Sequence, residues 1–120
     1  AYGAAISACE KGEQPRLALK LFEEMRLKML PANVITYGAV ISACEKGKQW
    51  EQALLLFKEM RQKIVVPDIR IYNVVMSACE KGKQWEKALQ LFEEMRRTAL
   101  APNVISYGAV ISACEKGKQS

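Results

Sequence analysis

The four cysteines have the most reactive side chains in this chain of 120 residues, because thiols can bind metal ions or form disulfides. The chain contains no histidine, which excludes imidazole zinc sites, Ser-His-Asp triads and Cys-His pairs. Adjacent glutamates such as Glu23 and Glu24 diverge by about 100° around a helix, so they form no carboxylate dyad. We therefore expect no catalytic residue, no metal and no other cofactor, and a protein that is not an enzyme.

The spacing of the cysteines reveals an internal repeat. Each lies in the string SACEKG, and the strings recur every 35 residues together with a tyrosine seven residues before each cysteine. Periods of this length are typical of helical repeat arrays. Counting from the tyrosines gives a partial unit over 1–33, full units over 34–68 and 69–103, and a truncated unit over 104–120. Because both ends cut through a unit, we expect further repeats of a parent chain on either side.

Within each unit the apolar residues follow a helical period. Residues 37, 40, 41 and 44 fall on one stripe of a first helix, with Thr36 and Ser106 as expected N-caps. Gly47 is expected to end that helix in the left-handed conformation. A second helix follows from Trp50, and Pro67 stops it.

The second helix carries more apolar surface than its own partner can cover. Ala53 allows the first helix to approach closely, whereas Leu21, Leu56 and Leu91 lie off that face. The remaining surface must pack on the next hairpin, which predicts an all-α solenoid of 35-residue helix-turn-helix repeats with seven helices.

In this fold the cysteines are expected in the core as free thiols. Packed helices lie about 8–10 Å apart, whereas a disulfide needs Cα atoms within about 7 Å. Cys9, Cys44, Cys79 and Cys114 therefore read as small apolar residues of the first helices.

The unit VITYGAVISACEKGKQWEQALLLFKEMRQKIVVPD resembles the pentatricopeptide repeat family. The V-x-T/S-Y opening, the E-K-G bend, the E-x-A-L-x-L-F-x-E-M second helix and the closing Pro-Asp or Pro-Asn carry this resemblance, and the 34-residue tetratricopeptide pattern is missing. The resemblance implies a right-handed superhelix that binds single-stranded RNA along its concave face, one base per repeat, in mitochondria or chloroplasts.

The family reads each base with the residue after the tyrosine and the residue that closes the unit. Carried onto this sequence, the base-reading residues are Gly3 with Asn33, Gly38 with Asp68, Asn73 with Asn103, and Gly108 alone. The Asn73 and Asn103 pair is similar to combinations that favour a pyrimidine, cytosine above uracil. Glycine has no side chain to read a base, so a purine is expected to fit the space at the glycine repeats.

Two further sets of residues are implicated by the resemblance. The residue two before each tyrosine packs against bases in the family, which here gives Ile35, Arg70 and Ile105. Arginine is unusual at this position. The alternative to base packing is that Arg70 is an exposed, solvated side chain. One lysine per unit resembles the family's phosphate contact, or else complements the helix dipole. These lysines are Lys11, Lys46, Lys81 and Lys116.

Two functions stay open. One is a sequence-selective RNA-binding module of an organellar RNA-processing factor, consistent with 18 basic against 13 acidic residues. The other is a helical-repeat scaffold for protein partners. Glycine and asparagine after the tyrosines suit a base edge better than a peptide, so RNA is favoured. We expect no membrane partner, because no apolar run approaches about 18 residues, and no small-molecule substrate.

Overall fold

The computed structural model describes residues 2–12, 14–98 and 103–117, and within them the chain forms seven α-helices and no strand. The ends of the predicted array, residues 1 and 118–120, lie outside the described residues. The helices are α1 (Tyr2–Lys11), α2 (Pro15–Leu27), α3 (Val34–Lys46), α4 (Trp50–Gln62), α5 (Ile69–Lys81), α6 (Trp85–Arg97) and α7 (Val104–Gly117).

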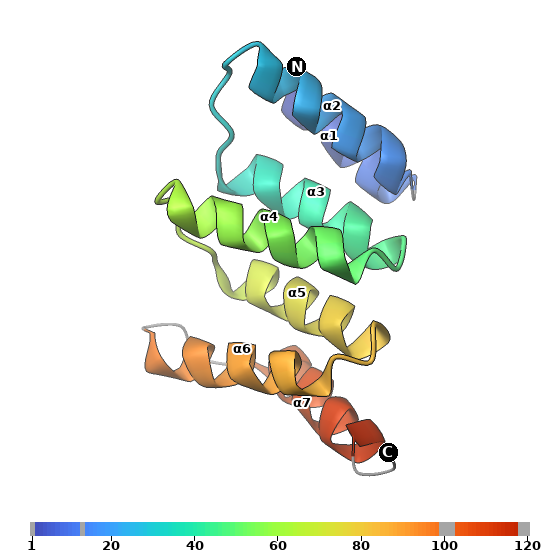
Figure 1. The fold of residues 1–120 in the computed structure, drawn as a ribbon, viewed down its shortest axis with the longest axis vertical. Coiled ribbons are helices and arrows are strands. Elements are labelled where there is room, and N and C mark those ends of the chain that lie inside the picture. The colour runs from blue at the N-terminus through green and yellow to red at the C-terminus, as the bar shows by residue number, and fades with distance from the viewer. Residues whose placement is uncertain (1, 13, 99–102, 118–120) are drawn as a thin grey trace.

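The helices stack as hairpins in two layers (Figure 1). The first helices α1, α3, α5 and α7 pack one on the next, while α2, α4 and α6 each contact the first helices on either side. The all-α solenoid and its seven helices are thus confirmed. Helices α3, α5 and α7 begin at the first residues of the predicted units, and the division of the chain into those units stays a prediction.

The core lies between the two layers. Helix α3 is surrounded by neighbours, so its residues from Thr36 to Cys44 are all buried. Helix α4 is amphipathic and buries Ala53, Leu56, Phe57 and Met60. Of the three off-face leucines, Leu56 and Leu91 are buried, as predicted for side chains that must pack on a neighbouring repeat, and Leu21 is partly buried against the core.

Tyr37 joins neighbouring repeats through its ring and its hydroxyl. Its ring meets Phe22 of α2 edge-on, with centroids 5.2 Å apart. Its hydroxyl donates to Glu59 Oε2 at 2.9 Å, and Arg26 binds the other oxygen of that carboxylate at 2.8 Å. Burial and then the bond to Glu59 raise the pKa of Tyr37 to about 12. Residues Phe57, Arg61, Tyr72 and Glu94 repeat these contacts one unit later.

The expected N-caps were wrong. Asn33 Oδ1 accepts from the backbone N–H of Thr36 at 2.9 Å, and Asp68 Oδ1 accepts from Ile71 at the same distance. The N-cap is therefore the residue that closes the preceding unit. A cap oxygen must reach the N–H group three residues on, so it has to lie before the helix and not within its first turn.

The expected conformation of Gly47 was also wrong. Gly47 has φ of −86°, and the left-handed residue is Lys48, with φ of 60°. The Gln49 N–H then bonds to the carbonyl of Cys44 at 2.8 Å, which closes a Schellman-type turn. Glycine is needed at 47 for another reason, since a Cβ there would lie 2.9 Å from the Pro15 Cβ.

All four cysteines are free, as predicted; Cys9, Cys44 and Cys79 are buried and Cys114 is partly exposed. Within the described residues no three Cys, Asp or Glu side chains gather as a metal site would require. None of the helices in that part of the chain combines the length and apolar character needed to traverse a bilayer.

The cysteines should react with an alkylating reagent in a definite order. Burial raises the pKa of Cys44 and Cys79 to about 11, so near neutral pH they are protonated as well as covered. Cys114 should be labelled first and these two last, as followed by mass spectrometry of peptides over time. The urea-denatured chain is the control, in which all four should react alike. Native labelling of Cys44 as fast as Cys114 would contradict the packing of α3.

Candidate nucleic-acid interface

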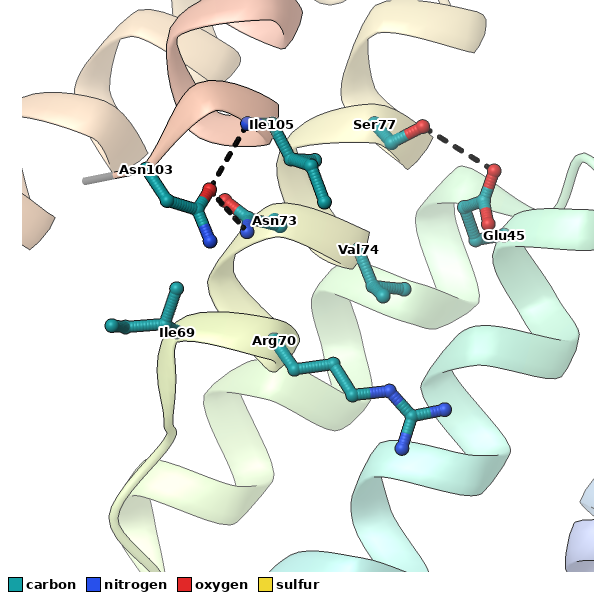
Figure 2. A pocket seen from close by; sticks show the side chains of 8 residues that line it. All are labelled: Glu45, Ile69, Arg70, Asn73, Val74, Ser77, Asn103 and Ile105. Carbon is teal, nitrogen blue, oxygen red and sulfur yellow. Dashed lines mark hydrogen bonds between the residues drawn. The ribbon is translucent and has the colours of Figure 1, made fainter.

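A pocket of about 510 Å³ opens between α5 and α7 (Figure 2). It brings together four residues that the sequence placed in different roles: Arg70, Asn73, Asn103 and Ile105. Glu45, Ile69, Val74 and Ser77 complete its lining. The predicted Asn73 and Asn103 base-reading pair and two of the three predicted base-packing residues thus surround one space.

The two asparagines in this pocket bond to each other. Asn73 Nδ2 donates to Asn103 Oδ1 at 3.2 Å (Figure 2). Asn73 is almost fully buried, whereas Asn103 is exposed at the start of α7. The Ser106 hydroxyl donates to Asn73 Oδ1, so both ends of the Asn73 amide are held.

The start of α7 determines which way the Asn103 amide faces. Its Oδ1 accepts from the backbone N–H groups of Ile105 and Ser106, each at 3.1 Å. A helix N-terminus offers donors and no acceptors, so the oxygen must face it. The nitrogen of Asn103 therefore points away from α7 and toward the pocket (Figure 2).

The glycine repeats lack such a paired amide. Gly38 is buried with Ile71 nearby, and Gly3 lies opposite Thr36. Around Gly108 the described residues leave space, with no atom within 4 Å of a built Cβ. In the first two of these repeats the closing residues, Asn33 and Asp68, are exposed helix caps.

The predicted base-packing residues share one surface. Ile35, Arg70 and Ile105 each follow the first residue of a first helix and are exposed, by 72% for Ile35 and 61% for Ile105. Arg70 extends over α3, and its guanidinium lies 3.7 Å from Glu10 of α1. We refer to the exposed side of α1, α3, α5 and α7 that carries these three residues as the first-helix face.

The predicted phosphate lysines are paired with glutamates. Lys46 Nζ lies 2.5 Å from Glu10, Lys81 is paired with Glu45, and Lys116 with Glu80 of the preceding repeat. The bond from Lys46 outweighs the burial of Glu10 and lowers the pKa of that carboxyl. All three lysines keep more than a third of their side chains exposed, as in a ladder of ion pairs across the repeats. Lys11 is exposed.

Family models match almost the whole chain. A pentatricopeptide repeat domain matches residues 1–47 and 20–82, and a PPR repeat family matches residues 67–116. The chain belongs to the pentatricopeptide repeat family. No curated protein matches it.

Solved pentatricopeptide repeat structures share the fold. The protein PPR10 in complex with an 18-nt psaJ RNA element is 27% identical over 96% of this chain, with a TM-score of 0.84. A structure of PPR10 from maize is 26% identical over 97% of this chain, with a TM-score of 0.82. The PPR domain of Arabidopsis thaliana protein-only RNase P 1, in complex with tRNA, is 21% identical over 95% of this chain and 61% of its own length, with a TM-score of 0.85. The chain spans 17% of the length of PPR10.

The sequence did not reveal the roles of Ser106 and of three glutamates in this repeat array. Ser106 was taken for a cap, whereas its hydroxyl contacts a base-reading candidate of the preceding repeat. The glutamates at positions 10, 45 and 80 were not assigned a partner. Their signal was present, because each glutamate directly precedes a lysine, and a shift of one repeat therefore places glutamate and lysine 36 residues apart.

Proposed function

We propose that the chain is a non-catalytic module that binds single-stranded RNA along its first-helix face, one base per repeat, within an organellar RNA-processing factor. The observation that carries this proposal is the pocket in which Arg70, Ile105, Asn73 and Asn103 meet. In this proposal Arg70 and Ile105 flank a base, and the two asparagines contact its edge. The similarity to PPR10, solved with an 18-nt RNA, supports the class of ligand.

The hydrogen-bond pattern of the pocket favours cytosine. Asn103 Oδ1 is occupied by the helix and by Asn73, and Asn73 Oδ1 by Ser106, so the groups left for a base are N–H donors. Cytosine presents two adjacent acceptors, O2 and N3, on its pairing edge. Uracil presents an N–H between its two carbonyl groups and would meet a donor with a donor.

The glycine repeats favour purines in this proposal. At Gly38 the base has only Asp68 to contact, and Asp68 keeps one carboxylate oxygen free beyond the one that caps α5. A free acceptor suits the N–H groups of a guanine edge. At Gly3 the amide nitrogen of Asn33 is the free group, because its oxygen caps α3, and a donor suits the ring nitrogen of adenine.

The lysines of the interrepeat ion pairs contact the RNA phosphate backbone in this proposal. A phosphate that approaches Lys46, Lys81 or Lys116 meets an exposed ammonium group whose partner is a carboxylate of the preceding repeat. A lysine has three donors and can serve both partners. The carboxylates also repel the phosphates, so they are expected to moderate affinity without abolishing it.

Binding should favour single-stranded RNA over duplex of the same sequence and should weaken with salt. Lys46→Ala and Lys81→Ala should each flatten the plot of log affinity against log salt by about one unit, because each releases one counterion fewer. Glu45→Gln should raise affinity, since Lys81 would then be free for phosphate. The assay is an NMR titration with short oligonucleotides at several salt concentrations.

The matched control for Glu45→Gln is Glu51→Gln, which makes the same change in net charge at an exposed position of α4. It should leave affinity close to the wild-type value. Equal affinity for duplex and single strand, or salt slopes unchanged by both lysine variants, would refute RNA binding along the first-helix face.

A further inference from the structure

We refer to the pocket between α5 and α7 as the Asn73 pocket. We propose that Ser106 is a positioning residue that sets the base selectivity of this pocket by fixing the direction of the Asn73 amide. The inference rests on the proposed RNA-binding function and adds to it a residue outside the base-reading pair. Ser106 is fully buried at the third position of α7, and α7 packs against α5, the helix that carries Asn73. A base in the pocket is contacted by Asn73 and Asn103, and Ser106 acts through them.

The hydroxyl of Ser106 has a single proton, and its surroundings determine where that proton goes. Asn73 Oδ1 and Asn103 Oδ1 both lie within hydrogen-bond distance of Ser106 Oγ. Asn103 Oδ1 is already supplied by two backbone N–H groups and by Asn73 Nδ2. Among the hydrogen bonds of the described residues, Asn73 Oδ1 accepts from this hydroxyl alone, so Ser106 donates to Asn73.

The reversed orientation of the Asn73 amide is disfavoured at the end that faces Asn103. It would place Asn73 Oδ1 against Asn103 Oδ1, two acceptors with no proton between them. Asn103 cannot turn to relieve this contact, because α7 holds its oxygen. Ser106 and the helix start thus fix the amide with its nitrogen toward the pocket.

The other repeats lack an equivalent of the hydrogen bond from Ser106 to Asn73 in the described residues. The third residue of each first helix faces the residue after the tyrosine in the preceding repeat. Thr36 lies opposite Gly3 and Ile71 opposite Gly38, with 3.9 Å and 3.5 Å to a built Cβ. A hydroxyl opposite glycine has no amide to orient, and isoleucine has no hydroxyl. In the described residues, Asn73 with Ser106 is the pair in which both partners are present.

Removing the hydroxyl should release the amide while the bonds of Asn103 Oδ1 to the helix start persist. In Ser106→Ala the backbone N–H groups of residues 105 and 106 keep their bonds to Asn103 Oδ1. The Asn103 N–H loses Ser106 Oγ as its acceptor, and the buried Asn73 Oδ1 loses its donor. An unpaired buried carbonyl is unfavourable, so the Asn73 side chain should rotate and no longer present its N–H. Ser106→Thr keeps a hydroxyl, as Thr36 does at the same position two repeats earlier.

The test measures the ratio of affinities for oligonucleotides with cytosine or uracil at this position. Ser106→Ala should bring the ratio toward one, a loss of about tenfold, while affinity for the other bases persists. Ser106→Thr should restore the ratio. Thr36→Val, opposite Gly3, is the matched control and should leave the ratio at the Asn73 pocket unchanged. NMR exchange of the Asn73 side-chain amide, without RNA, should be slow in wild type and Ser106→Thr and faster in Ser106→Ala.

Two outcomes separate this inference from the function on which it rests. If the wild-type chain binds no single-stranded RNA, the proposed function fails, and the selectivity role of Ser106 fails with it. If wild type binds and Ser106→Ala keeps the full preference for cytosine, the RNA-binding proposal stands and the role of Ser106 is refuted.

Discussion

Asn103→Asp should reverse the preference of the Asn73 pocket from cytosine to uracil. The N-cap position holds one side-chain oxygen against α7, so the variant turns the other side-chain atom from an N–H donor into a carboxylate acceptor. That acceptor faces the N–H of uracil favourably and the bare ring nitrogen of cytosine unfavourably. The expected change is about 1–3 kcal/mol in the difference between the two bases, the range for a good side-chain contact to a base.

The measurement is competition between oligonucleotides that differ by one cytosine or uracil, placed at each position in turn within a purine background. Asp and Asn are nearly equal N-caps, so the variant should unfold at the wild-type urea concentration. Asp68→Asn is the reciprocal control: it should change the preference at the Gly38 repeat and leave the order of cytosine and uracil at the Asn73 pocket intact. An unchanged order in Asn103→Asp would show that Asn103 does not read the base.

Gly82→Ala should destabilise the array by about 1–3 kcal/mol, the usual cost of forcing an extra carbon into a packed contact. A Cβ on Gly82 would lie 2.8 Å from the indole nitrogen of Trp50 and closer still to the adjacent ring carbons. The contact joins the end of α5 to the start of α4 in the preceding repeat, so the ring has to move and the stacking loosens. Urea denaturation followed by circular dichroism measures the loss.

Two further variants distinguish a steric cause from a conformational one. Gly108→Ala has open space around the built Cβ and should stabilise its helix by about 0.5–1 kcal/mol, as alanine normally does. Trp50→Ala combined with Gly82→Ala should cost less than the sum of the two single changes, because the clash disappears with the ring. Additive costs would mean that Gly82 is required for its backbone and not for space, although its φ of −86° is open to any residue.

The sequence alone was enough to predict the repeat, the helices and the solenoid. A 35-residue period with apolar residues at helical spacing makes each hairpin bury more surface than it can cover by itself, and stacking follows from that excess. The residues of the candidate site could also be named, since the resemblance gives Asn73, Asn103, Arg70 and Ile105 by position. Their assembly around one pocket depends on neighbouring repeats, which bring residues about 30 positions apart together.

The tertiary structure decided which atoms are available for chemistry. Hydrogen bonds between repeats fix the two asparagine amides, and ion pairs between repeats engage Lys46, Lys81 and Lys116. The pattern within one unit suggested a conformational reason for Gly47, whereas the structure shows a steric one imposed by Pro15 of the preceding hairpin. Periodicity reports which face of a helix is buried. It does not report which neighbouring donor or acceptor each polar atom meets, because those partners are set by the stacking of one repeat on the next.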